Sequence, residues 1–250
     1  MTEHRAAAVG VISPSVRDLI LSRNPKLDPS KIVYVPNPTD ESIFYPLSQN
    51  DDPEPLVDWR DSFTVMYVGA VGEVQGLDTV LEAAQLLRAK GEIRIVIVGD
   101  GIARARLERE ASERGIENVT FLGRVPKEQV PSLMKTADLH LVSLGPSTFL
   151  EFTTPSKIAS LLASEVPIVG QISGDGARLI HSAGAGLTSS PGNAEDLADV
   201  ILHMSNIGAE SLRVHAKNGR SYYEANLSAE MTAQKIVASL AASVAFGDAA

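Results

Sequence analysis

The chain reads Phe63-Thr-Val-Met-Tyr-Val-Gly-Ala-Val-Gly-Glu-Val-Gln-Gly76 where a continuous apolar run meets a turn that contains three glycines. The run up to Val68 has the length of a buried strand. Apolar residues at helical spacing follow from residue 77 to residue 88. Because parallel strands are joined by a crossover helix, this order predicts the first unit of a parallel α/β sheet.

The same alternation continues through the centre of the chain. Short apolar runs predict strands at residues 63–68, 93–98, 119–122, 139–144, 168–170 and 186–188. Helix-period segments lie between or beside them at residues 77–88, 103–114, 130–137, 156–163 and 177–182. Strands that alternate with helices form right-handed βαβ units, so we expect a parallel sheet with helices on both faces.

The two ends of the chain differ from this centre. Residues 8–12 and 31–35 predict short strands around a helix at 15–23, and the Pro- and Asp-rich residues 46–58 are typical of a linker. After Gly192 the pattern is helical, with segments at 194–205, 210–226 and 228–244. We expect three parts, at residues 1–60, 61–225 and 226–250.

Composition restricts the classes of function. The chain has 250 residues, of which 44% are hydrophobic and 21% charged, as in a globular protein with a sizeable core. A net charge of -9 argues against nucleic acid as a partner, and the absence of cysteine removes thiol chemistry. The histidines are scattered without metal-ligand spacing, so no metal is expected. No run approaches the roughly 18 apolar residues of a membrane span, so we expect a soluble, cytoplasmic protein.

Lys157 stands at an unusual place for a cation. The run Thr153-Thr-Pro-Ser-Lys-Ile158 predicts a helix with Thr154 as N-cap and Pro155 at the first helical position. A positive charge in the first turn opposes the helix dipole, which favours anions there. Lys157 is therefore either a solvated lysine or a residue that shares an anion, most simply a phosphate, with free backbone N–H groups.

Three turns follow predicted strands, which is where open parallel sheets bind ligands. The glycines of the turn at residues 69–76 let a backbone approach a phosphate, although a tight connection without a ligand explains them equally well. Asp100 can bind ribose hydroxyls or cap the helix that starts near residue 103. Arg124 can stack on a planar base or remain exposed in its turn.

The order of the motifs is more specific than any one of them. The chain contains, in sequence, Val98-Gly-Asp-Gly101, Val119-Thr-Phe-Leu-Gly-Arg-Val-Pro126, Ala137-Asp138, Pro155-Ser-Lys157 and Ala163-Ser-Glu-Val-Pro167. This series resembles the C-terminal half of group 1 (family 4) glycosyltransferases, whose GT-B fold has Rossmann-like domains. Gly72-Glu-Val-Gln-Gly76 and Pro155-Ser-Lys157 are most similar to the O-antigen fucosamine-transferase-type branch. Val11-Ile-Ser13 and Val35-Pro-Asn-Pro-Thr-Asp40 resemble the passage between the family's two domains, and the resemblance covers roughly residues 8–240.

The resemblance implies a site for a nucleotide-sugar donor, a UDP- or GDP-sugar, with no separate cofactor. Gly72, Gln75 and Gly76 would hold the diphosphate, while Lys157 would face a phosphate or the donor sugar. Glu151 would lie near the donor sugar. The base and ribose would lie against Asp100, Gly101, Arg124, Val125 and Ser160. No catalytic residue is assigned.

Several positions depart from the family pattern. Ala70 and Gln75 stand where an arginine and a lysine usually contact the diphosphate. Phe152 and Ser160 stand where two glutamates usually contact the sugar and the ribose, and Glu151 is one position out of register. Because each lost charge-assisted hydrogen bond costs roughly 1.5–3 kcal/mol, about ten- to a hundredfold in affinity, we expect weak donor binding.

Family members also carry an N-terminal domain that holds the acceptor. By resemblance, residues 1–60 are a remnant of that domain with the interdomain linker, and residues 61–225 are the nucleotide-sugar-binding domain. We therefore expect either a truncated gene product or a partner that supplies the acceptor domain. The helix at 228–244 would pack toward that domain, and an uncovered apolar face there predicts self-association or a partner.

These observations leave more than one function open. The leading hypothesis is the donor half of a retaining, hexosyl-type glycosyltransferase of surface polysaccharide synthesis, acting on a saccharide or lipid-linked acceptor. Peripheral attachment to the inner face of the membrane stays undecided. The alternative is a catalytically silent module that binds a nucleotide or docks a partner. A dinucleotide-dependent oxidoreductase is disfavoured because the chain lacks G-x-G-x-x-G.

Overall fold

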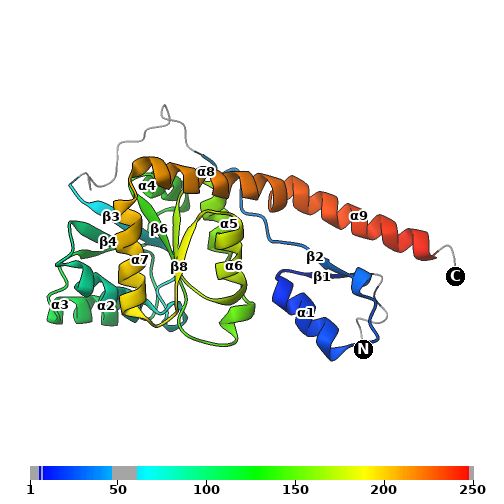
Figure 1. Cartoon of the computed structure of the whole chain (residues 1–250), viewed down its shortest axis with the longest axis horizontal. Helices are drawn as coiled ribbons and strands as arrows, with labels where there is room; N and C mark the ends of the chain where they lie inside the picture. The colour runs from blue at the N-terminus through cyan, green and yellow to red at the C-terminus, as the bar shows by residue number, and fades with distance from the viewer. Residues whose placement is uncertain (1–5, 7, 47–60, 248–250) are drawn as a thin grey trace.

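The computed structural model describes residues 6, 8–46 and 61–247. The linker predicted at residues 46–58 lies outside the described residues except for Pro46. The described part contains a six-stranded parallel sheet with the order β5-β4-β3-β6-β7-β8 (Figure 1). Its strands are β3 (Phe63–Val68), β4 (Ile93–Val98), β5 (Val119–Gly123), β6 (Leu139–Ser143), β7 (Ile168–Gln171) and β8 (Gly186–Ser189). The expected α/β parallel sheet is confirmed.

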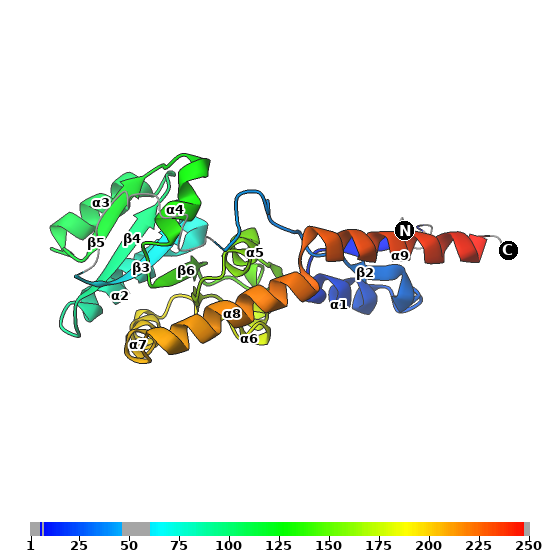
Figure 2. The ribbon, with the colours of Figure 1, turned by 90° about the horizontal axis from the view of Figure 1, so that it is seen from above.

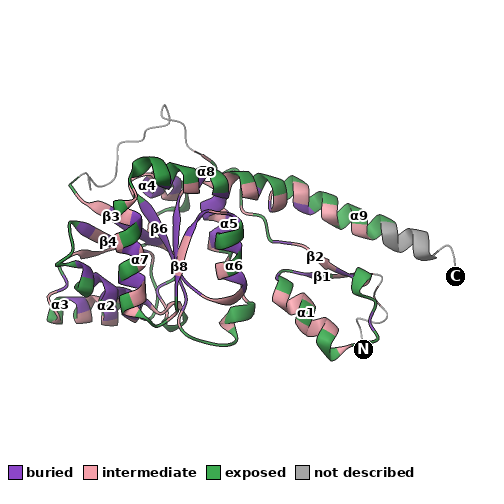
Figure 3. Ribbon diagram, in the orientation of Figure 1, coloured by how far each residue is buried: buried purple, intermediate pink, exposed green. Residues whose placement is uncertain are grey.

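Helices cover both faces of this sheet because its central strands are apolar on both sides. Val65, Met66 and Tyr67 of β3 are each at most 1% exposed, although successive side chains point to opposite faces. One face packs against α2 (Leu77–Leu87), α3 (Arg104–Glu113) and α7 (Ala194–Asn206). The other packs against α4 (Val130–Met134), α5 (Ser156–Ala163), α6 (Gly174–Ser182) and α8 (Ala209–Asn226). Figure 3 shows the resulting buried sheet between partly exposed helices.

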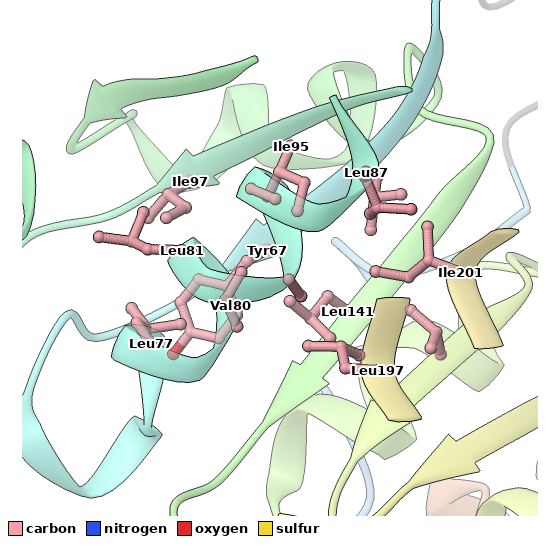
Figure 4. Close-up of a cluster of buried hydrophobic side chains, with 14 of the residues drawn as sticks. Tyr67, Leu77, Val80, Leu81, Leu87, Ile95, Ile97, Leu141, Leu197 and Ile201 are labelled. Atoms are coloured by element: carbon pink, nitrogen blue, oxygen red, sulfur yellow. The ribbon is translucent and has the colours of Figure 1, made fainter. Parts of the chain in front are cut away.

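The first of these cores is the larger one. It joins Tyr67, Ile95 and Leu141 of the strands to side chains of α2 and α7, as Figure 4 shows. Each fully buried aliphatic or aromatic side chain stabilises the fold by about 1.5–3 kcal/mol relative to its exposed state. The core therefore fixes the carboxyl ends of β3 and β6, between which the loops of interest lie.

A small N-terminal unit lies beside the C-terminal helix (Figures 1 and 2). Its parallel strands β1 (Val9–Val11) and β2 (Ile32–Tyr34) are joined by α1 (Pro14–Arg23) and the 3-10 turn η1 (Pro29–Lys31). The long helix α9 (Ala229–Gly247) runs along this unit, and the Lys235 amine lies 5.7 Å from the Tyr34 ring centroid. No helix among the described residues is long and apolar enough to cross a membrane.

The segment after β2 crosses to the sheet domain through polar contacts. The Thr39 N–H donates to the Tyr223 hydroxyl at 3.3 Å. That hydroxyl and the Ala229 N–H both donate to Glu41 Oε1, at 2.8 and 2.9 Å. Burial and the bond to Glu41 raise the pKa of Tyr223 to about 12, so the hydroxyl stays a donor at neutral pH. The junction of α8 and α9 is thus fixed to the crossing segment.

One predicted helix start is wrong. α5 begins at Ser156, and Pro155 is the N-cap residue with an extended ψ of 130°. Thr154 therefore does not cap this helix, because no side chain bonds its first turn. The prediction also omitted the 3-10 turns η2 (Glu73–Gln75), η3 (Lys127–Gln129) and η4 (Leu150–Phe152), which are too short to give a periodic pattern.

Candidate functional site

The sheet has a topological switch point between β3 and β6. The chain runs outward from β3 to β5, then returns to β6 and runs outward in the opposite direction. The loops that follow β3 and β6 therefore diverge at the carboxyl edge, where open parallel sheets bind their ligands. The Gly145 N–H of the second loop donates to the Val74 carbonyl of the first at 2.8 Å, so the two loops hold each other.

The glycine loop, residues 69–76, is held by side chains at the ends of β6 and β7. Ser143 Oγ donates to the Gln75 carbonyl at 2.6 Å, and Gln171 Nε2 donates to the Gly76 carbonyl at 3.1 Å. Gly76 has a φ of 60°, and a Cβ atom there would lie 2.7 Å from the Gly145 Cα atom. Only glycine fits this approach, so the loop backbone is preorganised.

Within this loop, the Gln75 side chain turns back on the backbone. Its Oε1 atom accepts a hydrogen bond from the Gly72 N–H at 3.1 Å. The Gln75 and Gly76 N–H groups donate to the Gly72 and Glu73 carbonyls at 3.4 and 3.2 Å, so all three N–H groups of the predicted phosphate cradle are occupied by the loop itself. A nearby cation, Arg106, is also engaged, because it pairs with Asp78 and, at 3.0 Å, with Glu73.

Lys157 extends from the first turn of α5 to the start of the glycine loop. Its amine nitrogen lies 3.8 Å from the centroid of the Tyr67 ring, and a Cβ atom at Gly69 would come within 2.7 Å of it. The amine is buried and has no hydrogen-bond partner among the described residues. Burial lowers the pKa of Lys157 to about 7. The interpretation of a solvated lysine is therefore wrong.

The Tyr67 side chain, which the sequence analysis did not single out, supports both elements. Its hydroxyl donates to the Ala70 carbonyl at 2.7 Å while its ring contacts the Lys157 amine. Burial raises the pKa of Tyr67, so the hydroxyl remains protonated. A tyrosine two residues before a glycine turn was the available signal, but the same residue fits any buried strand.

Asp100 and Gly101 lie directly beneath the glycine loop. The Val71 N–H donates to the Asp100 carbonyl at 3.0 Å, and a Cβ atom at Gly101 would overlap the Val71 carbonyl. The Asp100 carboxylate accepts from the Gly101 N–H at 2.8 Å. The N-cap of α3 is Ala103, without a side-chain bond, so the alternative that Asp100 caps this helix is wrong.

The remaining candidates lie around this centre. Arg124 is exposed in the turn after β5, and Val125 packs on a small cluster between the sheet and α4. Ser160 lies three residues after Lys157, where its hydroxyl is 2.7 Å from Thr39 Oγ1 of the crossing segment. Glu151 is exposed in η4. The structure thus joins Lys157 to the glycine loop, whereas Ser160 is already paired.

Asp175 is a buried polar residue that sequence reasoning missed. The Ser15 N–H at the start of α1 donates to its carboxylate at 3.0 Å, and Ser15 Oγ and Arg178 add further bonds. Burial alone would raise the pKa of Asp175, but these hydrogen bonds outweigh it and lower the pKa. Because the partners are 160 residues apart in the chain, no local pattern could reveal the contact.

The comparisons with known proteins agree with this geometry. The family model described as "Glycosyl transferases group 1" matches residues 62–206, more than half of the chain. The chain belongs to this family. The match spans all six strands of the large sheet and the helices between them.

Two relatives in this family illustrate the extent of the similarity. WcaI of Escherichia coli K12, named as a glycosyl transferase of colanic acid biosynthesis, is 39% identical over 99 residues, which are 40% of this chain and 24% of WcaI. WbjE of Pseudomonas aeruginosa, named as a probable glycosyltransferase, is 25% identical over 203 residues, 78% of this chain and 50% of WbjE. The chain thus spans at most half the length of these relatives.

The solved structures show the same fold. Anabaena HepE in complex with UDP superimposes with a TM-score of 0.78 at 18% identity, over 95% of this chain and 65% of that one. Sucrose-phosphate synthase from Thermosynechococcus elongatus gives a TM-score of 0.70 at 22% identity, over 94% of this chain and 57% of that one. The expected GT-B-type domain architecture is therefore confirmed.

Proposed function

We propose that this chain is the donor-binding half of a retaining glycosyltransferase of surface polysaccharide synthesis. It binds a UDP- or GDP-sugar for transfer to a saccharide or lipid-linked acceptor, and it belongs to the fucosamine-transferase-type branch. The observation that supports this function is the buried, unpaired amine of Lys157 beside the glycine loop at the switch point. A buried amine without a hydrogen-bond partner is costly unless an anion completes it.

Lys157 would also supply part of the positive charge that is missing where the chain departs from the family pattern. Ala70 and Gln75 provide no charge to the diphosphate, and Arg106 is neutralised by Glu73 and Asp78. Because the N–H groups of Gly72, Gln75 and Gly76 already donate within the loop, the Lys157 ammonium would carry most of the stabilisation of the departing diphosphate. A single cation in a buried position interacts more strongly than one in water, which offsets part of the missing charge.

The acceptor side is proposed to come from elsewhere, either from a longer form of the protein, a partner domain or a second copy. α9 presents exposed Ile236, Val237 and Leu240 beside the N-terminal unit. Exposed apolar side chains that are neighbours on one helix are typical of an interface. Light scattering at high concentration would test this part, since a strictly monomeric chain would contradict self-association.

The donor site can be tested by isothermal titration with UDP and GDP. Lys157→Ala should weaken binding more than tenfold, by the roughly 1.5–3 kcal/mol of a charge-assisted hydrogen bond. The matched control is Lys90→Ala, which removes an exposed lysine after α2. Equal effects of the two substitutions would refute the assignment. Nucleotide binding without any donor turnover would favour the silent binding module.

A further inference from the structure

A cavity lined in part by Glu151 lies at the carboxyl ends of β6, β7 and β8. Its volume is about 650 Å³, within the usual range for small-molecule sites. The hydroxyls of Ser147, Thr148, Ser173 and Ser189 line it together with the carboxylates of Glu151 and Asp196. We call this cavity the hydroxyl pocket.

Several hydroxyls of this pocket have no hydrogen-bond partner among the described residues, although the Thr188 hydroxyl lies 2.9 Å from His181 Nε2. Ser189 is 3% exposed, and its Oγ atom is buried without a hydrogen-bond partner among the described residues. Leaving such a group unsatisfied costs about 1–3 kcal/mol, so an orphaned hydroxyl in a cavity wall indicates a missing partner. In the described part of the chain, the Ser147, Thr148 and Ser173 side chains also form no hydrogen bonds within the protein.

The charge of the pocket restricts the ligand. None of its described lining residues is lysine, arginine or histidine, whereas Glu151 and Asp196 contribute carboxylates. Asp196 already accepts from the Ser190 N–H at 2.7 Å, and Glu151 is free to accept from a ligand hydroxyl. A ligand that carries a carboxylate or phosphate would be repelled, because like charges that lack a counter-ion are unfavourable.

We propose that the hydroxyl pocket binds the ring of a neutral pyranose and discriminates against acidic sugars. The inference rests on the proposed function, since the ring belongs either to the sugar of the donor or to the acceptor. The proposal separates two binding regions by their charge. The Lys157 cation would bind the diphosphate, while the hydroxyls and carboxylates of the pocket would bind the sugar. The wall from β7 and β8 would then determine which sugars fit.

Saturation-transfer NMR on the whole chain can test the proposal with methyl α-D-glucopyranoside, methyl α-D-mannopyranoside and D-glucuronate as probes. Ser189→Ala should weaken binding of a neutral glycoside about fivefold, as expected for one hydrogen bond of about 1 kcal/mol. The matched control is Ser164→Ala, because the Ser164 hydroxyl is also buried and unpartnered but lines a cavity near the amino ends of β6 and β7. UDP and GDP affinities should not change in either variant.

The outcomes separate this inference from the proposed function. Displacement of the glycoside by UDP-glucose or GDP-mannose, but not by UDP or GDP, would assign the ring to the donor, whereas no displacement by any of them would assign it to the acceptor. Normal nucleotide binding with no glycoside signal would overturn the hydroxyl pocket. So would equal signals for glucuronate, or an equal loss in both variants. A glycoside signal without nucleotide binding would refute the donor site and leave the pocket standing.

Discussion

Raising the pH from 7 to 9 should weaken the binding of nucleoside diphosphates through the loss of charge on Lys157. Its amine is buried against the Tyr67 ring with no hydrogen-bond partner in the described structure. Burial lowers the pKa of Lys157 to about 7, so the ligand-free protein loses this charge within the physiological range. A phosphate bound beside the amine would raise its pKa again, because the opposite charge favours the ammonium form.

The size of the effect follows from the fraction of protein that carries the charge. With a pKa of about 7, the ammonium fraction is roughly one half at pH 7, a tenth at pH 8 and a hundredth at pH 9. If only this form binds, the apparent Kd rises by about 50-fold between pH 7 and pH 9. Binding should also take up about 0.5 proton at pH 7 and about 0.9 proton at pH 8.

Calorimetric titration in two buffers of different ionisation enthalpy measures this uptake directly. Lys157→Met provides the control, since the titration of the nucleotide phosphates is common to both proteins. Proton uptake near zero in the unaltered chain would refute the reasoning, and so would the same pH slope in Lys157→Met. The free energy of unfolding of the ligand-free protein should instead rise between pH 7 and pH 10.5. In this range the unfolded chain, in which the lysine pKa is 10.5, binds more protons than the folded chain.

Three further substitutions test the supports of the site. Gly76→Ala should lower the free energy of unfolding in urea well beyond Gly115→Ala, because both have a φ of 60° but only the first would clash, with Gly145. Asp175→Asn should cost about 2–4 kcal/mol at pH 7, a difference that disappears as the pH falls below 3.8, since the folded-state pKa is lowered. Tyr67→Phe should cost about 1 kcal/mol and loosen nucleotide binding a few-fold, measured by titration, because the glycine loop loses one hydrogen bond.

The sequence predicted the sheet well because burial on both faces gives apolar runs that need no knowledge of their partners. The charge of Lys157 in a first helical turn also marked it before any contact was known. Its burial was not predictable, because it depends on Tyr67, which is 90 residues earlier in the chain. The start of α5 was misplaced because a proline suits both the N-cap and the first helical position.

Other parts of the site arise only from the folded topology. Gln171 reaches Gly76 across 95 residues, and Asp175 reaches Ser15 across 160. The hydroxyl pocket is assembled from the ends of three strands, so no single segment carries its pattern. Serine and threonine are common in turns for local reasons, which conceals their role as a shared lining.

The bonds around Asp175 have a mechanical consequence. Ser15 at the start of α1 is held by a carboxylate at the start of α6, and Ser13 Oγ donates to the Phe152 carbonyl at 2.8 Å. These hydrogen bonds connect the N-terminal unit to η4, the 3-10 turn that carries Glu151. A rotation of that unit relative to the sheet domain would therefore displace the turn that carries Glu151.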